Sequence, residues 1–216
     1  MIKNIFFDYD GVISDSVNVK TDAFYKMFLQ HGEEIAKKVK QHHLENGGMS
    51  RFKKFSYYYK EFLKIEIDEI KVIQLAEEFS RLVLEGVINS PLIKGVYEFL
   101  SENYKTMNFW IISGTPTEEI NLIIKRKNID NFFKGAYGSP ENKIYWSDFL
   151  TKKFNLNKTE TIFIGDALAD YEAAKENGLR FVLREDTENI RLFEQIDDIA
   201  LRIKDFIDFN SKLNLL

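Results

Sequence analysis

Four short apolar runs, each followed by a small or charged residue, form the clearest pattern along the chain. They are IFF at 5–7, FWII at 109–112, TIFI at 161–164 and RFVL at 180–183. Short runs that are apolar throughout are typical of strands buried on both faces of a parallel sheet. Segments with helical periodicity lie between them, at 91–104, 116–127, 144–154 and 168–177. This alternation predicts an α/β fold with right-handed crossovers.

Residues 17–88 break the alternation, because they contain helical periodicity and no convincing strand. Ser90-Pro91 marks the return to the first pattern, since the residue before a proline disfavours the helical region. We therefore expect a core formed by 1–16 and 89–216, with an all-helical insertion at 17–88. The last charged stretch, RIKDFIDFNSKL at 202–213, is expected to be a solvent-exposed helix. The apolar positions that recur at helical spacing in the insertion include Phe24, Met27, Phe28, Ile35, Ala36, Val39, Phe55, Tyr59, Phe62, Leu63, Val72, Leu75, Ala76, Phe79 and Leu82.

Composition excludes several classes of function. The 30 basic and 34 acidic residues give a formal charge of -4, and no long basic stretch is present. We therefore expect no nucleic-acid partner. The chain has no cysteine, so disulfides, thiolate metal sites and cysteine nucleophiles are excluded. No apolar segment has the length of a signal-peptide core or a membrane span, and we expect a cytoplasmic protein that has no membrane partner. The sequence says nothing of the oligomeric state.

Acidic residues follow the first and third apolar runs. Asp8 and Asp10 come after the first, and Asp166 comes after the third with Asp170 four residues on. The carboxyl ends of parallel strands meet at one edge of a sheet, so these four side chains are expected to converge. Clustered carboxylates raise one another's pKa values and need a cation, and an all-oxygen ligand set favours Mg²⁺. Gly11 allows the sharp turn that follows the first pair.

The residues around this cluster suggest phosphoryl chemistry. Ser113, after the second run, can donate its hydroxyl to a phosphoryl oxygen, and Gly114 and Thr115 can add backbone N–H groups. Thr115 is also suited to capping a helix that begins at Pro116, with Glu118 completing a capping box.

Three further side chains complete the proposed chemistry. Lys143 follows a turn signalled by GSP and can neutralise the remaining negative charge. An ionised Asp8 can attack phosphorus. Asp10 can protonate the leaving alkoxide and then take a proton from the hydrolytic water.

DYDGV at 8–12, WIISGT at 110–115, Lys143 and GDALAD at 165–170 together resemble the motifs of the haloacid dehalogenase superfamily of phosphatases. The helical insertion after the first motif resembles the C1 cap of phosphoglycolate phosphatase and β-phosphoglucomutase relatives. The resemblance implies a Rossmann-like core, a mobile helical cap, and Mg²⁺ held by Asp8, the backbone carbonyl of Asp10, and Asp166. It also implies that Asp170 supports the metal shell or orients Lys143.

Departures from the family patterns narrow the branch. True dehalogenases lack the second acid of the first motif, so Asp10 favours phosphate over halide chemistry. Lys20 stands where the β-phosphoglucomutase pattern has a histidine, which disfavours mutase activity. Phosphonatases use a cap lysine as a Schiff base, but no motif singles out Lys20, Lys53 or Lys54.

The stretch HHLENGGMSRFKKF at 42–55 is the best place to look for specificity. Gly47 and Gly48 would form a loop against the catalytic edge, from which Arg51 could reach a substrate phosphate or carboxylate. His42 and His43 are interpreted as helix-surface or cap-core residues rather than metal ligands.

The sequence therefore predicts a Mg²⁺-dependent phosphatase that hydrolyses a small phosphorylated metabolite, of the phosphoglycolate or sugar phosphate type, through an aspartyl-phosphate. Two alternatives remain. One is a sugar phosphomutase, which shares the first half-reaction. The other is a phospho-accepting receiver module, which the helical insertion and the GDALAD carboxylates fit poorly.

Overall fold

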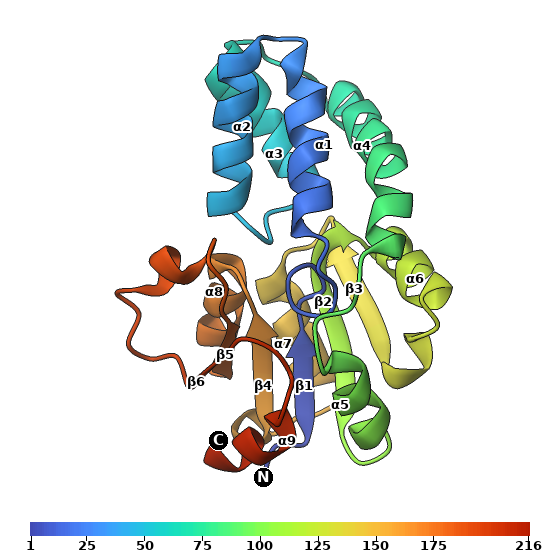
Figure 1. Ribbon diagram of the computed structural model, residues 1–216, viewed down its shortest axis with the longest axis vertical. Helices are drawn as coiled ribbons and strands as arrows, with labels where there is room; N and C mark the ends of the chain where they lie inside the picture. The colour runs from blue at the N-terminus through green and yellow to red at the C-terminus, as the bar shows by residue number, and fades with distance from the viewer.

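The computed structural model describes all 216 residues and contains one six-stranded parallel sheet with the strand order β3-β2-β1-β4-β5-β6 (Figure 1). β1 lies inside the sheet and pairs with β2 on one side and β4 on the other. The apolar runs of β1, β2, β4 and β5 thus form strands as predicted. The strands are Asn4–Phe7 (β1), Asn108–Pro116 (β2), Gly135–Ser139 (β3), Thr161–Gly165 (β4), Arg180–Arg184 (β5) and Leu201–Ile203 (β6).

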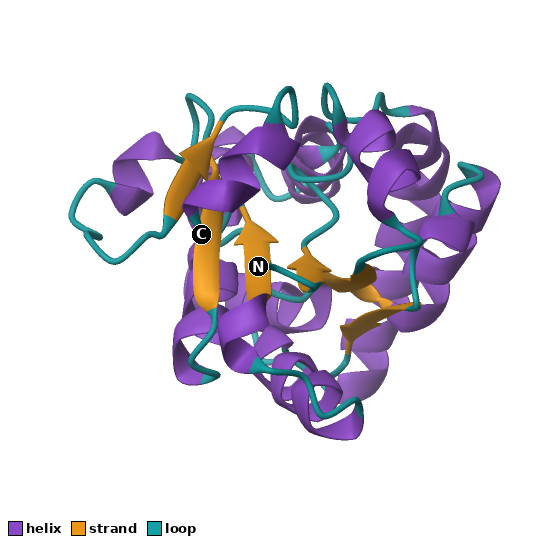
Figure 2. Cartoon of the chain, turned by 90° about the horizontal axis from the view of Figure 1, so that it is seen from below, coloured by secondary structure: helices purple, strands orange, loops and turns teal.

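Helices cover both faces of the sheet, as the view from below shows (Figure 2). Alternate side chains of β1 explain this arrangement, because successive residues of a strand point to opposite faces. Ile5 and Phe7 pack with α5 (Val96–Asn103) and α9 (Phe209–Lys212), whereas Phe6 packs with α7 (Lys143–Lys153) and α8 (Leu168–Glu176). The sheet therefore has a separate apolar core on each face, which accounts for strands that are apolar throughout.

Residues 17–89 form a helical lobe above the carboxyl ends of the strands (Figure 1). Its centre is aromatic: Phe24 packs against Phe55, Tyr58 and Phe79 with ring centroids 4.2 to 5.7 Å apart. No helix of the lobe or of the rest of the structure combines the length and apolar character needed to cross a bilayer. The lobe consists of α1 (Val17–Leu29), α2 (Glu33–Glu45), α3 (Arg51–Tyr57), a π-helical turn (Tyr58–Leu63) and α4 (Glu69–Asn89).

Three local predictions were wrong. β3 and β6 were missed, because GAYGS at 135–139 and LRI at 201–203 contain no long apolar run. The stretch 202–213 is not a solvent-exposed helix: it begins in β6, and Phe206 and Phe209 are buried against Phe99. The helix expected from Pro91 begins only at Val96, after Gly95, whose φ is 80°.

Candidate active site

The ends of three adjacent strands bring the predicted residues together. Phe7 of β1 is level with Ile111 of β2 and Ile164 of β4. The backbone N–H of Asp8 donates to the carbonyl of Ile164 at 2.9 Å, so the chain stays in register one residue beyond the strand. The segment after β1, the last residues of β2 and the segment after β4 consequently lie at the same edge, beneath the helical lobe.

Three carboxylates gather at this edge. Ligand oxygens of Asp8, Asp166 and Asp170 all lie within 4.8 Å of one another. Burial raises the pKa of Asp166 well above its usual value, and the charges of Asp8 and Asp170 raise it further. Burial likewise raises the pKa of Asp170, to about 7. Such a set is electrostatically unfavourable by itself and has the oxygen donors that a hard divalent cation prefers.

Two glycines allow the carboxylates to approach the backbone. Gly11 has a φ of 79°, and a Cβ built on it would lie 2.0 Å from Oδ2 of Asp166. A Cβ on Gly165 would lie 2.2 Å from the Cβ of Asp170. No larger residue fits at either position without displacing an acid. The predicted sharp turn at Gly11 therefore also leaves room for the carboxylate of another strand.

Lys143 links two of the acids. Its Nζ lies 2.8 Å from Oδ1 of Asp8 and 2.5 Å from Oδ1 of Asp170. Burial by itself would lower the pKa of Lys143, but the two carboxylates more than offset this effect and raise it. Asn142 caps α7 by accepting from the Tyr145 N–H at 2.8 Å, which sets the position of Lys143 at the start of that helix. Lys143 is therefore a fixed ammonium beside Asp8.

Asp10 is oriented differently from the other three acids. Its carboxylate accepts hydrogen bonds from Lys20, Thr115 and Ser16, the last at 2.7 Å. Burial would raise the pKa of Asp10, but the charge and hydrogen bond of Lys20 hold it below its usual value. The expected group of four carboxylates is thus a group of three, with Asp10 in an ion pair beside it. The backbone carbonyl of Asp10 accepts no hydrogen bond, so it is available to a ligand.

The last residues of β2 lie between the acids and the lobe. The hydroxyl of Ser113 accepts from the N–H of Thr115 at 3.1 Å, and the hydroxyl of Thr115 accepts from Lys20 at 2.6 Å. The predicted capping role of Thr115 was wrong. β2 continues to Pro116, α6 (Thr117–Arg126) begins one residue later, and the Thr115 side chain points toward Lys20 and Asp10 instead.

The glycine loop between α2 and α3 rests on this edge. A Cβ on Gly114 would lie 2.7 Å from the carbonyl oxygen of Gly48, and one on Gly48 would lie 3.3 Å from Nζ of Lys143. The lobe and the strand ends are therefore in direct contact at the site, as expected for residues 47 and 48.

Arg51 lies at the lobe but is already paired. Its guanidinium donates to both carboxylate oxygens of Glu119 on α6, at 2.7 and 2.8 Å, and also to Ser80. It lies over the ring of Phe79, 4.8 Å from the centroid. The predicted contact between Arg51 and a substrate is not tested by this arrangement. The pair connects α3 to α6, and no sequence signal indicated Glu119 as its partner.

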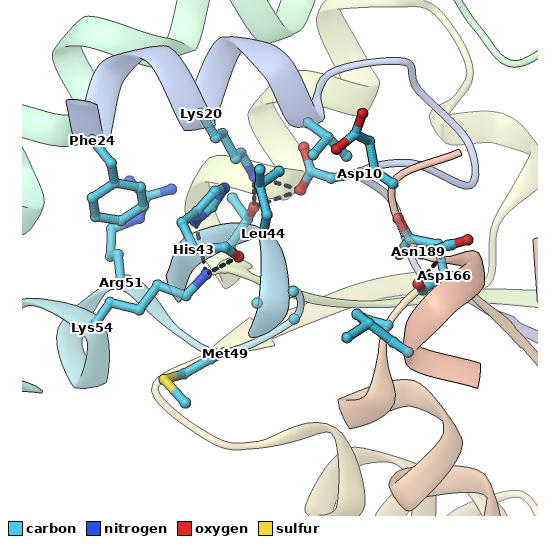
Figure 3. A pocket seen from close by; sticks show the side chains of 18 of the residues that line it. Asp10, Lys20, Phe24, His43, Leu44, Met49, Arg51, Lys54, Asp166 and Asn189 are labelled. Carbon is cyan, nitrogen blue, oxygen red and sulfur yellow. Dashed lines mark hydrogen bonds and ion pairs between the residues drawn. The ribbon is translucent and has the colours of Figure 1, made fainter. Parts of the chain in front are cut away.

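A cavity of about 100 Å³ lies between the lobe and the strand ends (Figure 3). The lobe contributes Lys20, His43 and Lys54, and the opposite wall contributes Asp10 and Asp166. Sequence reasoning did not select His43, Lys54 or Asn189, whose amide donates to the carbonyl of Asp166 at 2.8 Å. Only the position of the two lobe residues in the stretch 42–55 gave a signal.

Known proteins match both the sequence and the fold. A profile of the haloacid dehalogenase-like hydrolase family matches residues 2–178. A β-phosphoglucomutase from Clostridium difficile has a similar structure, with a TM-score of 0.78, 21% identity and coverage of 100% of this chain and 97% of its own. A protein described as a predicted phosphoglycolate phosphatase from Haemophilus somnus 129pt has a TM-score of 0.73 and 20% identity, with 98% of each chain covered.

A third similar structure is a haloacid dehalogenase-like hydrolase, SP0104 from Streptococcus pneumoniae, with a TM-score of 0.71, 18% identity and 98% of each chain covered. A search of curated proteins found no match. The structural likenesses, all at low identity, show the fold, and the family profile covers the strand ends that carry Asp8, Ser113, Lys143 and Asp166. The chain belongs to the haloacid dehalogenase-like hydrolase family.

Proposed function

We propose that the protein is a Mg²⁺-dependent phosphatase that transfers the phosphoryl group of a small phosphorylated metabolite to Asp8 and then to water. The observation that carries the proposal is the buried contact of Asp8 with Lys143, next to Asp166 and Asp170. Oδ1 of Asp8 accepts from Lys143 and from the Tyr9 N–H at 2.7 Å, so the carboxylate is held in one orientation.

The residues present fit a divalent cation. Asp8, Asp166 and the free carbonyl of Asp10 would hold the ion directly, and Asp170 would orient Lys143 and support the ion's shell. The ion would supply a positive charge that offsets repulsion among the acids and between them and the phosphoryl oxygens.

Each remaining step has a residue in place. An oxygen of Asp8 forms a bond to phosphorus as the ester P–O bond breaks, and Asp10 delivers its proton to the leaving alkoxide. Asp10, now a carboxylate, takes a proton from the water that attacks phosphorus and releases phosphate from Asp8. Ser113 and the N–H of Gly114 would donate to the phosphoryl oxygens, and Lys143 would neutralise their charge. The N–H of Thr115 donates to the Ser113 hydroxyl and so would help to orient it. The first step requires Asp10 to be protonated and the second requires it to be ionised. Lys20 holds the pKa of Asp10 below its usual value and so favours the form that the second step requires.

The helical lobe is proposed to act as a cap, with residues 1–16 and 89–216 as the core. Its glycine loop contacts Gly114 at the site, so closure of the lobe over a bound substrate would exclude bulk water. The cavity volume suits a small leaving group of the phosphoglycolate or sugar phosphate type, with Arg51 as a further candidate for contact with it. A cytoplasmic location stays a prediction.

A phosphomutase is the alternative with a specific likeness in its favour, the β-phosphoglucomutase fold. The structure offers one argument against it. The Nζ of Lys20, at the mutase histidine position, is engaged by Asp10 and Thr115. Incubation with a sugar 1-phosphate separates the two activities, because a mutase yields the isomeric sugar phosphate and a phosphatase yields inorganic phosphate.

Phosphate release from a panel of sugar phosphates, phosphoglycolate and nucleotides, with Mg²⁺ or with EDTA, tests the proposal. We expect release that requires Mg²⁺ and is lost in Asp8→Asn. The matched control is Asp15→Asn, which changes an exposed aspartate seven residues away and should leave release unchanged. Undiminished release in EDTA, or by Asp8→Asn, would refute the mechanism. A receiver module would show no multiple turnover with any ester.

A further inference from the structure

Lys54 is a buried cation with no acidic partner. Lys54 is 2% exposed, and its Nζ contacts Nδ1 of His43 at 2.8 Å and the His43 carbonyl at 3.5 Å. It also lies over the ring of Phe24, 5.7 Å from the centroid. The two other cationic side chains of the cavity are neutralised: Lys20 by Asp10 and Arg51 by Glu119. Lys54 is therefore the one cation on the cavity wall whose charge no acid of the chain offsets at hydrogen-bond distance.

The surroundings of Lys54 disfavour its charge. Burial lowers its pKa to about 7, and the charge of Lys20 contributes in the same direction. His43 keeps Nδ1 free to accept, because burial and the nearby Lys54 hold the pKa of the imidazole well below its usual value. An uncompensated buried ammonium is costly, and a ligand anion at hydrogen-bond distance removes the cost. The other titratable groups that act on Lys54 or line the cavity are Lys143, Asp10, Asp166, Asp186 and Glu188.

The position of Lys54 relates it to the leaving group. Figure 3 shows its amine directed from α3 toward the interior of the cavity, beneath His43, with Asp10 and Asp166 on the far wall. A phosphoryl group at Asp8 would occupy the strand-end side, so the leaving group of the ester would extend toward the lobe. The cavity is small, with a volume of about 100 Å³. The far end of such a leaving group would reach the lobe wall.

The geometry points to Lys54 as the residue that selects substrates whose leaving group bears an oxyanion, a carboxylate or a second phosphate, with His43 positioning its amine. This inference rests on the proposed phosphatase function and names its substrate class. The oxyanion would supply the acid partner that Lys54 lacks in the free protein.

Three phosphate esters with one carbon skeleton test the inference: 3-phosphoglycerate, glycerol 1,3-bisphosphate and glycerol 3-phosphate. They carry a carboxylate, a second phosphate and a neutral hydroxymethyl group at the remote end. We expect kcat/KM for one of the first two to exceed that for glycerol 3-phosphate by about tenfold or more, the range of a hydrogen bond to a charged group. Which of the two is preferred identifies the oxyanion.

Lys54→Met is the informative variant, because methionine fills a similar volume and leaves no buried charge. It should abolish the preference for the anionic ester while changing turnover of glycerol 3-phosphate and p-nitrophenyl phosphate by less than about twofold. If Lys54 had only a structural role, the variant would lose activity on all the esters alike. Lys60→Met, a matched change at an exposed lysine six residues on, should leave all four rates as they are.

The pH dependence of the preference gives a second readout. The ratio of kcat/KM for the preferred anionic ester to that for glycerol 3-phosphate cancels titrations common to both esters, such as those of Asp8 and Asp10. Below pH 7 Lys54 is protonated, and the ratio should be constant; above pH 7 it should fall toward about tenfold per pH unit as the amine loses its proton. In Lys54→Met the ratio should be flat.

Distinct results would overturn the inference. A wild-type enzyme that hydrolyses p-nitrophenyl phosphate but prefers neither anionic ester refutes the subsite and leaves the phosphatase proposal standing. So does a Lys54→Met variant that loses activity equally on all esters. Absence of turnover of every ester, p-nitrophenyl phosphate included, contradicts the proposed function and the subsite with it.

Discussion

An alanine at position 11 would place a methyl group inside the acidic cluster. The added Cβ would lie 2.0 Å from Oδ2 and 2.8 Å from Cγ of Asp166, and 3.2 Å from a methyl of Val17. Ordinary contact needs about 3.5 Å, so the Asp166 carboxylate must move by more than about 1 Å. A misplacement of this size in a catalytic group costs about 100-fold in rate. We therefore expect Gly11→Ala to lose at least about 100-fold in kcat/KM and to need more Mg²⁺ for half-maximal activity.

Alanine at position 11 also strains the backbone, which lowers stability apart from any effect on Asp166. The same substitution at Gly32 separates the loss of stability from the loss of activity. Gly11 has a φ of 79° and Gly32 a φ of 102°, so alanine is strained at both, by about 1 to 3 kcal/mol. A Cβ on Gly32 would meet nothing within 4 Å. Gly32→Ala should therefore lose comparable stability in urea unfolding while keeping its activity with p-nitrophenyl phosphate. Activity of Gly11→Ala within tenfold of that of Gly32→Ala would refute the assigned role of Asp166.

Three further changes have defined outcomes. Glu119→Gln should destabilise the protein by about 3 to 5 kcal/mol in urea unfolding, because it leaves Arg51 buried without its anion. Glu85→Gln, in an exposed pair, should leave the unfolding midpoint close to that of the wild type. Arg51 holds the pKa of Glu119 below its usual value, although burial alone would raise it. The stability that the pair contributes should therefore be lost as pH falls through that lowered pKa. The variant's stability should lack this dependence on pH, and an acid titration of its stability that matches the wild type would contradict the prediction. Lys20→Met should raise the pKa of Asp10 and move the acidic limb of the pH–rate profile upward, and an unchanged limb would count against the pairing. Removal of Mg²⁺ by EDTA should lower the melting temperature more at pH 7.5 than at pH 5. The pKa values of Asp166 and Asp170 are raised, so without the ion the protein loses stability as pH rises and these carboxylates ionise. An equal fall in melting temperature at both pH values would contradict this prediction.

The parts of the fold with a strong local pattern were predictable. β1, β2, β4 and β5 were identified because strands covered on both faces must be apolar throughout. β3 was not, since GAYGS at the edge of the sheet contains two glycines and a serine and has no apolar run. Residues 202–213 were wrongly predicted to form a solvent-exposed helix, because their charges suggested exposure. Phe206 and Phe209 of this stretch are instead buried in the core beside α5.

The candidate site also has residues that the sequence could identify and residues that it could not. Asp8, Ser113, Lys143 and Asp166 could be selected because each follows a strand or turn with a local signature. The partners of the lobe residues could not, because they depend on tertiary contacts. Glu119 lies 68 positions from Arg51, and His43 and Lys54 lie on different helices, α2 and α3, so their positions in the sequence do not show that their side chains meet in a cavity. Thr115 was assigned to a cap because the length of β2 cannot be read from its residues.

The central claim is that Asp8, in a cluster that binds a divalent ion, accepts the phosphoryl group. Mass spectrometry of the protein, acid-quenched within milliseconds of mixing with p-nitrophenyl phosphate and Mg²⁺, tests it most directly. The account predicts one phosphoryl group on the peptide that contains residue 8, and none with EDTA or in Asp8→Asn. A phosphoryl group on another residue, or one that forms as fast without the metal, would contradict it.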